Sequence, residues 1–557
     1  MLINELTAEG WNPEIIPKAS LVKIFPDMTS FQAAGGAAAN PGPVWIGPES
    51  YNYQQQTQFD GVPDVFDVTF GTSTENLSAN ILTGGGITAS TFANRLNYGT
   101  EIGWNAGTVM ADGHYVGLFK TVSLNLSSVD NLLFEFGFPE NSANTRINII
   151  IGSATNNSRA VVLNGYSKPE VCCISLKKSD FSQFAGTGAN WSNVTRIEFR
   201  FTSQVTTNPD LRRSMVIMRM AAGGYTKPTV ILSHDDIASQ LMNELPVIQN
   251  RKIVGTHFVT DTEILNSGAA TFGKMTRSQI DQWVRAGWLV CAHNIEHKAF
   301  SIPVSGYSKT GSTVSLTVDW GSSSNVKENI TLVNGDTITL ERIAIYSLNG
   351  TWTVTGVTQG ASKSTITFDH GNTTAIDSRA NLDGGVMTIN KYNIRDDNQV
   401  LNKMIEANGY LSDPEVMAYT YGHNGSTARR QLFLNGVRVC RSTGAKDNDS
   451  FLFQPRRKYG LDVFTQVNTQ NNAISYNSAL FDIPTFQLTT LTNLQTRVND
   501  LLNYGGVLSV YWHGDEPGMT TQIMLDSLNY LADLRDIGQI NLITFTDLKN
   551  MISNQIR

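Results

Sequence analysis

The pattern of apolar residues changes near residues 221–228, and this change constrains the fold more than any other feature of the sequence. From about 60 to 222, short runs of alternating apolar and polar residues are separated by Gly, Asn and Ser clusters. After that point, apolar runs of strand length alternate with segments of helical periodicity. Strand side chains repeat every two residues and helical ones every 3.6 residues, so one pattern does not serve both. The chain therefore contains at least two kinds of domain.

Residues 56–224 are predicted to form an all-β sandwich. Runs such as NLLFEFGF at 131–138 and RIEFRFTS at 196–203 recur at the spacing typical of sandwiches, and no helical pattern of useful length interrupts them. Residues 1–55 are rich in Gly, Ala and Pro around 31–50. We interpret them as a leader or adaptor with little core of its own.

Strands and helices alternate in 225–300 and 389–557, which is typical of a β/α domain with a largely parallel sheet. Thr276 and Gln279 form a capping-box pattern at the start of one predicted helix. Between the two halves, residues 301–388 show β alternation with hairpin-type turns and no helix. We interpret them as a small inserted β-domain, because loops at the rim of a rigid scaffold tolerate insertions.

Charge and composition exclude several classes of protein. The formal net charge is −7 and no basic tract occurs, which argues against nucleic acid or an anionic membrane as the main partner. No apolar stretch approaches the roughly 20 residues that span a bilayer, so membrane insertion is not expected. The first 17 residues lack a basic region followed by a continuous apolar one, so a signal peptide is not expected either. Cys172, Cys173, Cys291 and Cys440 lack CxxC spacing and are expected to be buried thiols.

Two short motifs follow predicted strands of the β/α region. Asp235 and Asp236 end the apolar run TVILS, and HNIEH places His293 and His297 at i and i+4, a spacing that on a helix puts both on one face. Both motifs lie at carboxyl ends of strands, where β/α folds build their sites. One carboxylate and two imidazoles leave Zn²⁺ an open position for water, and the second aspartate can take a proton from that water. The alternative is a surface Asp–Asp turn with two solvated histidines.

Three further motifs carry weaker signals. The stretch AYTYGHNG at 418–425 ends a strand in a Gly-flanked turn, which either donates a backbone N–H to an oxyanion or is only a turn. His513 follows the apolar strand at 507–512 and is either a general acid or structural. Arg441 lies in a strand expected to be buried, so it needs a carboxylate partner. That pair either orients an active-site residue or is a structural ion pair.

The order of these motifs resembles the polysaccharide deacetylase family, also called the NodB-homology or carbohydrate esterase family 4 domain. That family carries TFDD, then H[S/T]xxH, then RPPYG, then a Leu-rich strand that ends in His. This sequence carries SHDD, HNIEH, AYTYG and VYWH in the same order. The resemblance covers about 226–300 and 389–557. It implies a distorted β/α barrel that uses a divalent metal, with Zn²⁺ expected, to remove acetyl groups from a polysaccharide.

The resemblance also implies a role for each matching residue. The implied roles are base (Asp235), metal ligand (Asp236, His293 and His297), backbone oxyanion donor (Tyr421) and acid (His513). The chain departs from the family at Ala418, which replaces an arginine, and at Asn294, which replaces Ser or Thr. Arg441 is our candidate to supply the missing guanidinium from another strand.

The domain architecture resembles that of a bacteriophage tail spike or tail fibre. Such a protein would lie in the virion, attach to other tail proteins through its N-terminus and act outside the cell on bacterial surface polysaccharide. Tail spikes commonly form homotrimers, although no long heptad run here indicates one. Two alternatives stay open. One is a non-catalytic glycan-binding adhesin on a deacetylase scaffold, and the other is an amidohydrolase acting on a small molecule.

Overall fold

The computed structural model describes residues 23–25, 44–46 and most of the chain from 61 to 555. The longer gaps after residue 61 are 71–76, 83–92, 105–112, 138–144, 165–170, 204–212, 266–273, 321–330, 375–378, 381–384, 443–451 and 454–477. The predicted leader lies outside the described residues, apart from β1 (Lys23–Phe25) and β2 (Val44–Ile46), which pair in parallel. No helix among the described residues is long and apolar enough to cross a membrane.

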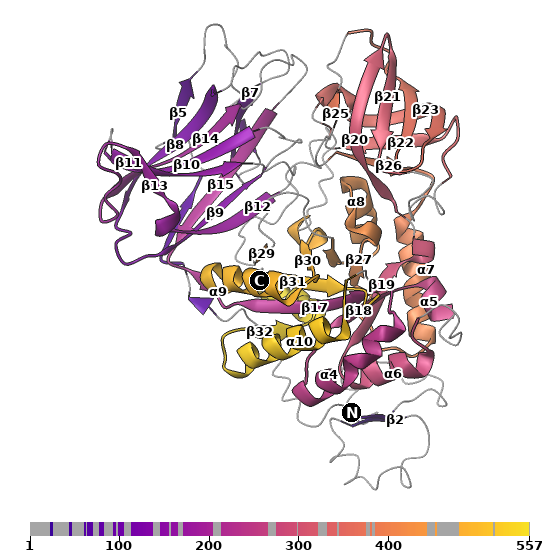
Figure 1. Cartoon of the computed structure of the whole chain (residues 1–557). Coiled ribbons are helices and arrows are strands. Elements are labelled where there is room, and N and C mark those ends of the chain that lie inside the picture. Colours follow the sequence, from indigo (N-terminus) through magenta and orange to yellow (C-terminus); the bar gives the residue numbers. More distant parts are fainter. Residues whose placement is uncertain are drawn as a thin grey trace, which may run out of the picture.

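Two antiparallel sheets form the body drawn in indigo to magenta in Figure 1. Alternate residues of the central strands, such as Ile197, Phe199 and Phe201 of β14 (Val194–Ser203), point into a shared core and are fully buried. One sheet has the order β13 (Ser182–Ala185), β11 (Asn157–Asn164), β10 (Thr145–Ala154), β14 (Val194–Ser203), β8 (Tyr115–Leu124) and β5 (Leu77–Leu82). The other has β12 (Val171–Lys177), β9 (Asn131–Gly137), β15 (Arg213–Ala222), β7 (Gly99–Trp104) and β6 (Ala93–Arg95), with β4 (Phe66–Thr69) beside β15.

The all-β character predicted for this region is confirmed. Among its described residues, the only helical element is the 3-10 turn Lys178–Asp180. A short pair, β3 (Gly61–Val62) and β16 (Tyr225–Thr226), lies where the chain leaves the sandwich.

Seven strands of a nine-stranded sheet close into a barrel-like ring. The closure occurs at Ile483, whose N–H donates to the Cys440 carbonyl (3.1 Å) and whose carbonyl accepts from the Ser442 N–H (3.0 Å). Going round the ring, the strands are β17 (Thr229–Asp235), β18 (Thr256–Thr260), β19 (Leu289–Asn294), β27 (Val416–Ala418), β28 (Val439–Arg441), β30 (Thr485–Gln487) and β31 (Val507–Trp512), all parallel. The remaining two are β29 (Leu452–Phe453) and β32 (Asn541–Ile543).

Helices surround this ring and share its core. They are α4 (Leu245–Arg251), α5 (Asp261–Leu265), α6 (Arg277–Arg285), α7 (Ile394–Ala407), α8 (Ser426–Leu434), α9 (Leu491–Tyr504), α10 (Thr521–Asp536) and α11 (Phe545–Gln555). The predicted capping box of α6 is confirmed, because Gln279 N–H donates to Thr276 Oγ1 (3.3 Å) and Thr276 N–H donates to Gln279 Oε1 (2.7 Å).

Two strands of this ring are shorter than the apolar runs of the sequence that contain them. The run at 251–260 forms a strand only from Thr256, because α4 ends at Arg251 and its left-handed C-cap, Lys252, turns the chain before the strand begins. The run at 415–422 leaves the sheet after Ala418 and turns into the 3-10 element Thr420–Gly422. Turn residues such as Gly422 favour this departure.

The region between β19 and α7 forms a second, smaller barrel with its own core. Its six antiparallel strands close because β20 pairs with both β21 and β26. In ring order they are β20 (Ser301–Thr310), β21 (Thr313–Val318), β24 (Ser364–Asp369), β23 (Gly350–Gln359), β22 (Thr337–Glu341) and β26 (Val386–Ile389), with the short β25 (Arg379–Ala380) beside β20. We call it the inserted barrel.

The seven-stranded ring and its helices form what we call the central barrel. The sandwich and the inserted barrel both contact it. Figure 1 shows the inserted barrel next to α8, and the sandwich on the side of α9. At the sandwich, Tyr504 Oη donates to Asp180 Oδ1 (3.3 Å) and Lys177 Nζ donates to Asn503 Oδ1 (3.4 Å). The inserted barrel begins close in sequence to the predicted metal ligands, because its first strand, β20, starts four residues after His297.

Candidate active site

The carboxyl ends of β17 and β19 carry the two predicted motifs. β17 ends at Asp235 and Asp236 follows it, while His293 lies within β19 and His297 ends the 3-10 turn Ile295–His297. The prediction that the histidines share a helical face is therefore wrong. A strand end and a tight turn bring the two rings together instead, with their centroids 5.2 Å apart.

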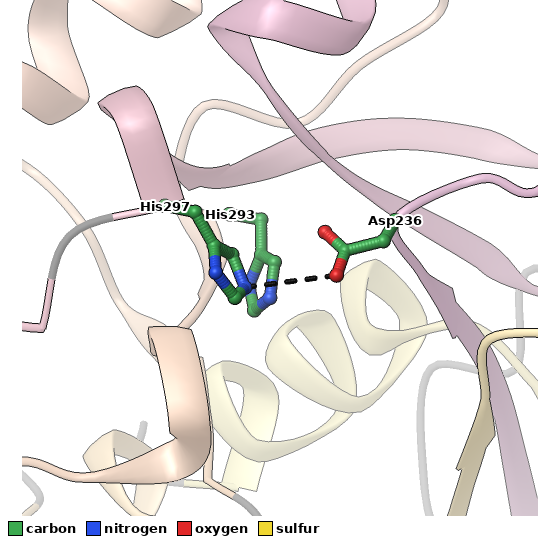
Figure 2. A group of neighbouring side chains, drawn as sticks. All are labelled: Asp236, His293 and His297. Carbon is green, nitrogen blue, oxygen red and sulfur yellow. Dashed lines mark ion pairs between the residues drawn. The ribbon is translucent and has the colours of Figure 1, made fainter. Parts of the chain in front are cut away.

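Asp236, His293 and His297 converge on one point, as Figure 2 shows. One ligand atom from each residue lies within 4.8 Å of the others, and His297 Nε2 is 3.6 Å from Asp236 Oδ2. His293 is buried, whereas the side chains of Asp236 and His297 are 23% and 28% exposed, so the group opens to solvent on one side. One carboxylate and two imidazoles fit a divalent metal such as Zn²⁺ and leave room for a further ligand.

Each histidine is oriented through its other ring nitrogen. His293 Nδ1 lies 3.2 Å from the Ala418 carbonyl oxygen, and His297 Nδ1 lies 3.0 Å from Tyr421 Oη. A carbonyl accepts only, so His293 Nδ1 carries the proton and Nε2 keeps its lone pair. Such contacts are the usual way in which a protein aims an imidazole at a metal.

Asp235 has a different neighbour from Asp236. Arg441 donates from Nη2 to Asp235 Oδ2 at 2.6 Å, and both side chains are buried. The other oxygen, Oδ1, is buried and has no hydrogen-bond partner among the described residues. Arg441 on β28 lies opposite Ala418 on the adjacent strand β27. Ala418 is the position at which carbohydrate esterase family 4 carries an arginine, so the guanidinium of Arg441 originates one strand away from that position.

The electrostatic environment sets the protonation of all four groups. Burial raises the pKa of Asp235, but Arg441 and nearby imidazoles outweigh it and hold the pKa below its usual value. Burial likewise raises the pKa of Asp236, and His297 and His293 reverse that effect. Burial lowers the pKa of His293 and brings that of His297 to about 4. At neutral pH the aspartates are ionised and the imidazoles neutral, which is the state that binds a metal cation.

Backbone strain is concentrated in this region. The described non-glycine residues with positive φ are Asp236 (52°), Lys252 (52°), Asn294 (110°), His297 (53°) and Tyr421 (56°). All but Lys252 belong to the candidate site or adjoin it. L-residues adopt such values at a cost in energy, and they persist only where neighbouring contacts hold them. Strain of this kind is typical of functional sites.

The remaining two predicted residues lie around the same group. Tyr421 is in the turn after β27, and its ring packs edge-on against His297 with centroids 4.6 Å apart. His513 follows β31 directly, is partly buried, and has its ring 5.7 Å from that of Tyr511. It is close enough to Asp235 and Asp236 to lower the pKa of both.

The sequence pattern missed two titratable residues that adjoin the site, Lys274 and Glu263. Lys274 donates from Nζ to the backbone carbonyl of Asp236 (2.6 Å) and lies 3.4 Å from Glu263 Oε1. Glu263 is buried, and burial together with Asp236 raises its pKa to about 8. Neither residue belongs to a motif, so only the folded chain reveals that they adjoin the site.

No protein-family model matches the sequence, and neither does any curated protein. Among solved structures, the chain is similar to a family 4 carbohydrate esterase from Streptomyces lividans in complex with acetate, with 11% identity, coverage of 56% of this chain and 91% of that one, and a TM-score of 0.26. It is also similar to the family 11 carbohydrate-binding module of a cellulosomal cellulase of Clostridium thermocellum, with 13% identity, coverage of 30% and 91%, and a TM-score of 0.18. The match to PfGH50B spans only 23% of that chain and 29% of this one, at 12% identity and a TM-score of 0.21. TM-scores this low do not establish a function for this chain.

Proposed function

We propose that this chain is a metal-dependent deacetylase that removes acetyl groups from a polysaccharide. The observation that carries the proposal is the pairing of the Asp236–His293–His297 group with a second carboxylate, Asp235, held separately by Arg441. A ligand group alone would also suit a structural ion. An ionised buried carboxylate beside it, with one oxygen unpaired among the described residues, adds a base. The motif order that resembles carbohydrate esterase family 4 supports the same reaction.

Asp235 and Asp236 have different roles in the proposed reaction. Asp236, His293 and His297 would hold the metal, which when bound polarises the acetyl carbonyl and acidifies a water molecule. Asp235 takes the proton from that water at Oδ1, because Arg441 already engages Oδ2. The lowered pKa of Asp235 keeps it ionised at neutral pH and so ready to accept the proton.

Tyr421 and His513 complete the proposed reaction. The backbone N–H of Tyr421 would donate to the oxyanion of the tetrahedral intermediate. His513 would protonate the leaving nitrogen or oxygen. Both residues follow strand ends of the central barrel, β27 and β31, and both are near the ligand group.

We further propose that the substrate is a bacterial surface polysaccharide and that the protein is a phage tail spike or tail fibre acting outside the cell. The all-β sandwich and the inserted barrel support this setting, because large flanking β-bodies suit an extended glycan better than a small amide. In this setting the N-terminal leader attaches to other virion tail proteins, and the chain forms a homotrimer. Light scattering on the purified protein tests that assembly.

Acetate release from a panel of purified bacterial surface polysaccharides tests the proposed activity. Wild type should release acetate, whereas Asp235→Asn and EDTA-treated wild type should not, and Zn²⁺ should restore the treated protein. Asp369→Asn is a matched control, because this exposed carboxylate accepts hydrogen bonds from Gly371 and Ser312 within the inserted barrel. Glycan binding without acetate release by metal-loaded protein would favour an adhesin. Release from small acetamides alone would favour an amidohydrolase.

A further inference from the structure

Tyr421 lies between the metal-ligand group and the inserted barrel. Its hydroxyl contacts His297 Nδ1, while its ring packs against the hydrophobic core of the inserted barrel. Its φ of 56° is one that a tyrosine adopts only when other contacts hold it. One side chain therefore joins the inserted barrel to a candidate metal ligand.

The helix after this turn depends on the inserted barrel for its N-terminal cap. The N-cap of α8 is Gly425, which has no side chain to accept a hydrogen bond. Glu341, at the end of β22, takes that role by accepting from the Thr427 N–H (3.2 Å) and the Thr427 hydroxyl (2.9 Å). A carboxylate at this end of a helix is also favoured by the helix dipole.

Gly425 permits this approach between the two bodies. A Cβ atom there would collide with the Glu341 carboxylate and would lie only 3.2 Å from Thr388 Oγ1 of β26. The backbone of the turn is therefore in direct contact with the inserted barrel. On the other side, the chain passes from His297 into β20 within four residues. The inserted barrel thus holds the His297 segment covalently and the Tyr421 segment through Glu341.

We infer that Glu341 is a positioning residue for the metal site. By capping α8 from the inserted barrel, it holds the segment 419–427, and through the Tyr421 hydroxyl it sets the orientation of His297. This inference rests on the proposed function, since it takes the site to bind a divalent metal. It gives the inserted barrel a role in the chemistry of the central barrel without contact with the reacting atoms.

Co²⁺ titration of the full-length protein tests the inference, with the affinity and the visible absorption spectrum of the bound ion as readouts. Loss of a contact that orients a metal ligand typically weakens metal affinity about 10–100-fold. Tyr421→Phe and Glu341→Ala should each weaken Co²⁺ binding about tenfold and alter the spectrum. Glu341→Gln keeps an acceptor oxygen and should bind as wild type does. Asp369→Asn, an acidic residue of the same barrel away from α8, is the matched control.

The double variant separates positioning from general damage. Because Glu341 acts through Tyr421, Glu341→Ala/Tyr421→Phe should bind Co²⁺ no more weakly than Tyr421→Phe alone. If Glu341→Ala does not fold, Thr427→Val replaces it in the test, because it removes the hydrogen bond from the Thr427 hydroxyl to Glu341. Additive losses, or wild-type affinity and spectrum in a folded Glu341→Ala or Thr427→Val, would overturn the inference and leave the metal site standing. A wild type that binds neither Co²⁺ nor Zn²⁺ would overturn the metal site and the inference together.

Discussion

The two faces of β17 use buried polar groups in opposite ways. Asp235 faces the candidate site, whereas the preceding residue, His234, packs on the other face against α6 and against side chains of the neighbouring strands β18 and β31. His234 stacks on Trp288 at 4.4 Å, its Nδ1 lies 3.2 Å from His257 Nδ1, and its Nε2 lies 3.3 Å from Glu244 Oε2. Glu244 also accepts from the indole N–H of Trp512 at 2.9 Å. All these side chains are buried.

The difference lies in access to solvent. On the outer face, the side chains of His234 and Glu244 are fully buried, in a cluster enclosed by tryptophan rings. On the site face, the side chains of Asp236 and His297 are partly exposed. Fully enclosed polar groups specify packing, whereas polar groups that reach solvent can also meet a ligand or substrate. Variants on the two faces should therefore affect different quantities.

The largest effect is expected from His297→Ala on the site face. Loss of a ligand should remove the metal and lower the rate of acetate release about a thousandfold, equivalent to about 4 kcal/mol of transition-state stabilisation. The free energy of unfolding of the metal-free protein should change little, because the ring is partly exposed. His370→Ala, which removes a histidine beside Trp352 in the inserted barrel, is the control. Full activity in His297→Ala would contradict the ligand assignment.

Arg441→Met should affect both stability and pH dependence. It leaves Asp235 buried without its cation, which typically costs about 3 kcal/mol in the free energy of unfolding. Because Arg441 lowers the pKa of Asp235, its removal should raise that pKa and move the acid limb of kcat/KM to higher pH. Denaturant unfolding and a pH–rate profile measure the two effects. An unshifted acid limb would exclude Asp235 as the base.

Glu244→Ala should lower the stability of the protein without weakening its binding of metal. It leaves the Trp512 N–H and His234 without their carboxylate, so the free energy of unfolding should fall by about 2 kcal/mol. Co²⁺ affinity of the folded protein should match wild type, because the cluster faces away from the ligands. Weaker Co²⁺ binding at unchanged stability would show instead that the outer face serves the site.

The smallest effect is a change in the pH dependence of stability. Burial lowers the pKa of His257 well below its usual value, so this residue stays neutral when folded and takes up a proton only when unfolded. Acid then favours the unfolded state, and stability should fall as the pH drops below about 6.5. His257→Gln should reduce this slope by up to one proton, about 1.4 kcal/mol per pH unit. Denaturant unfolding between pH 7 and 5 measures it, and an unchanged slope would contradict the neutral state of His257.

Much of the site could be predicted because its residues follow strands that are evident in the sequence. The runs before Asp235, His293 and His513 all form strands of the central barrel. Parallel strands gather their carboxyl ends at one rim, so the motifs could be expected to meet. The change of pattern near 221–228 likewise separates all-β from β/α elements in the structure.

Partners distant in sequence could not be predicted. A buried arginine requires a carboxylate, but only the fold pairs Arg441 with Asp235, 206 residues away. The contact of Glu341 with Thr427 depends on how two bodies dock, which no local pattern records. The spacing of His293 and His297 was misleading, because residues at i and i+4 can also meet when a strand end is followed by a 3-10 turn.

The most direct test of the account is the zinc content of Asp235→Asn and Asp236→Asn, measured by elemental analysis after dialysis against trace Zn²⁺. In the proposed mechanism, Asp236 binds the metal and Asp235 transfers the proton. Asp235→Asn should therefore retain one zinc ion per chain and release no acetate, whereas Asp236→Asn should lose the zinc. Equal zinc content in the two variants, whether retained or lost, would contradict this division between the two aspartates.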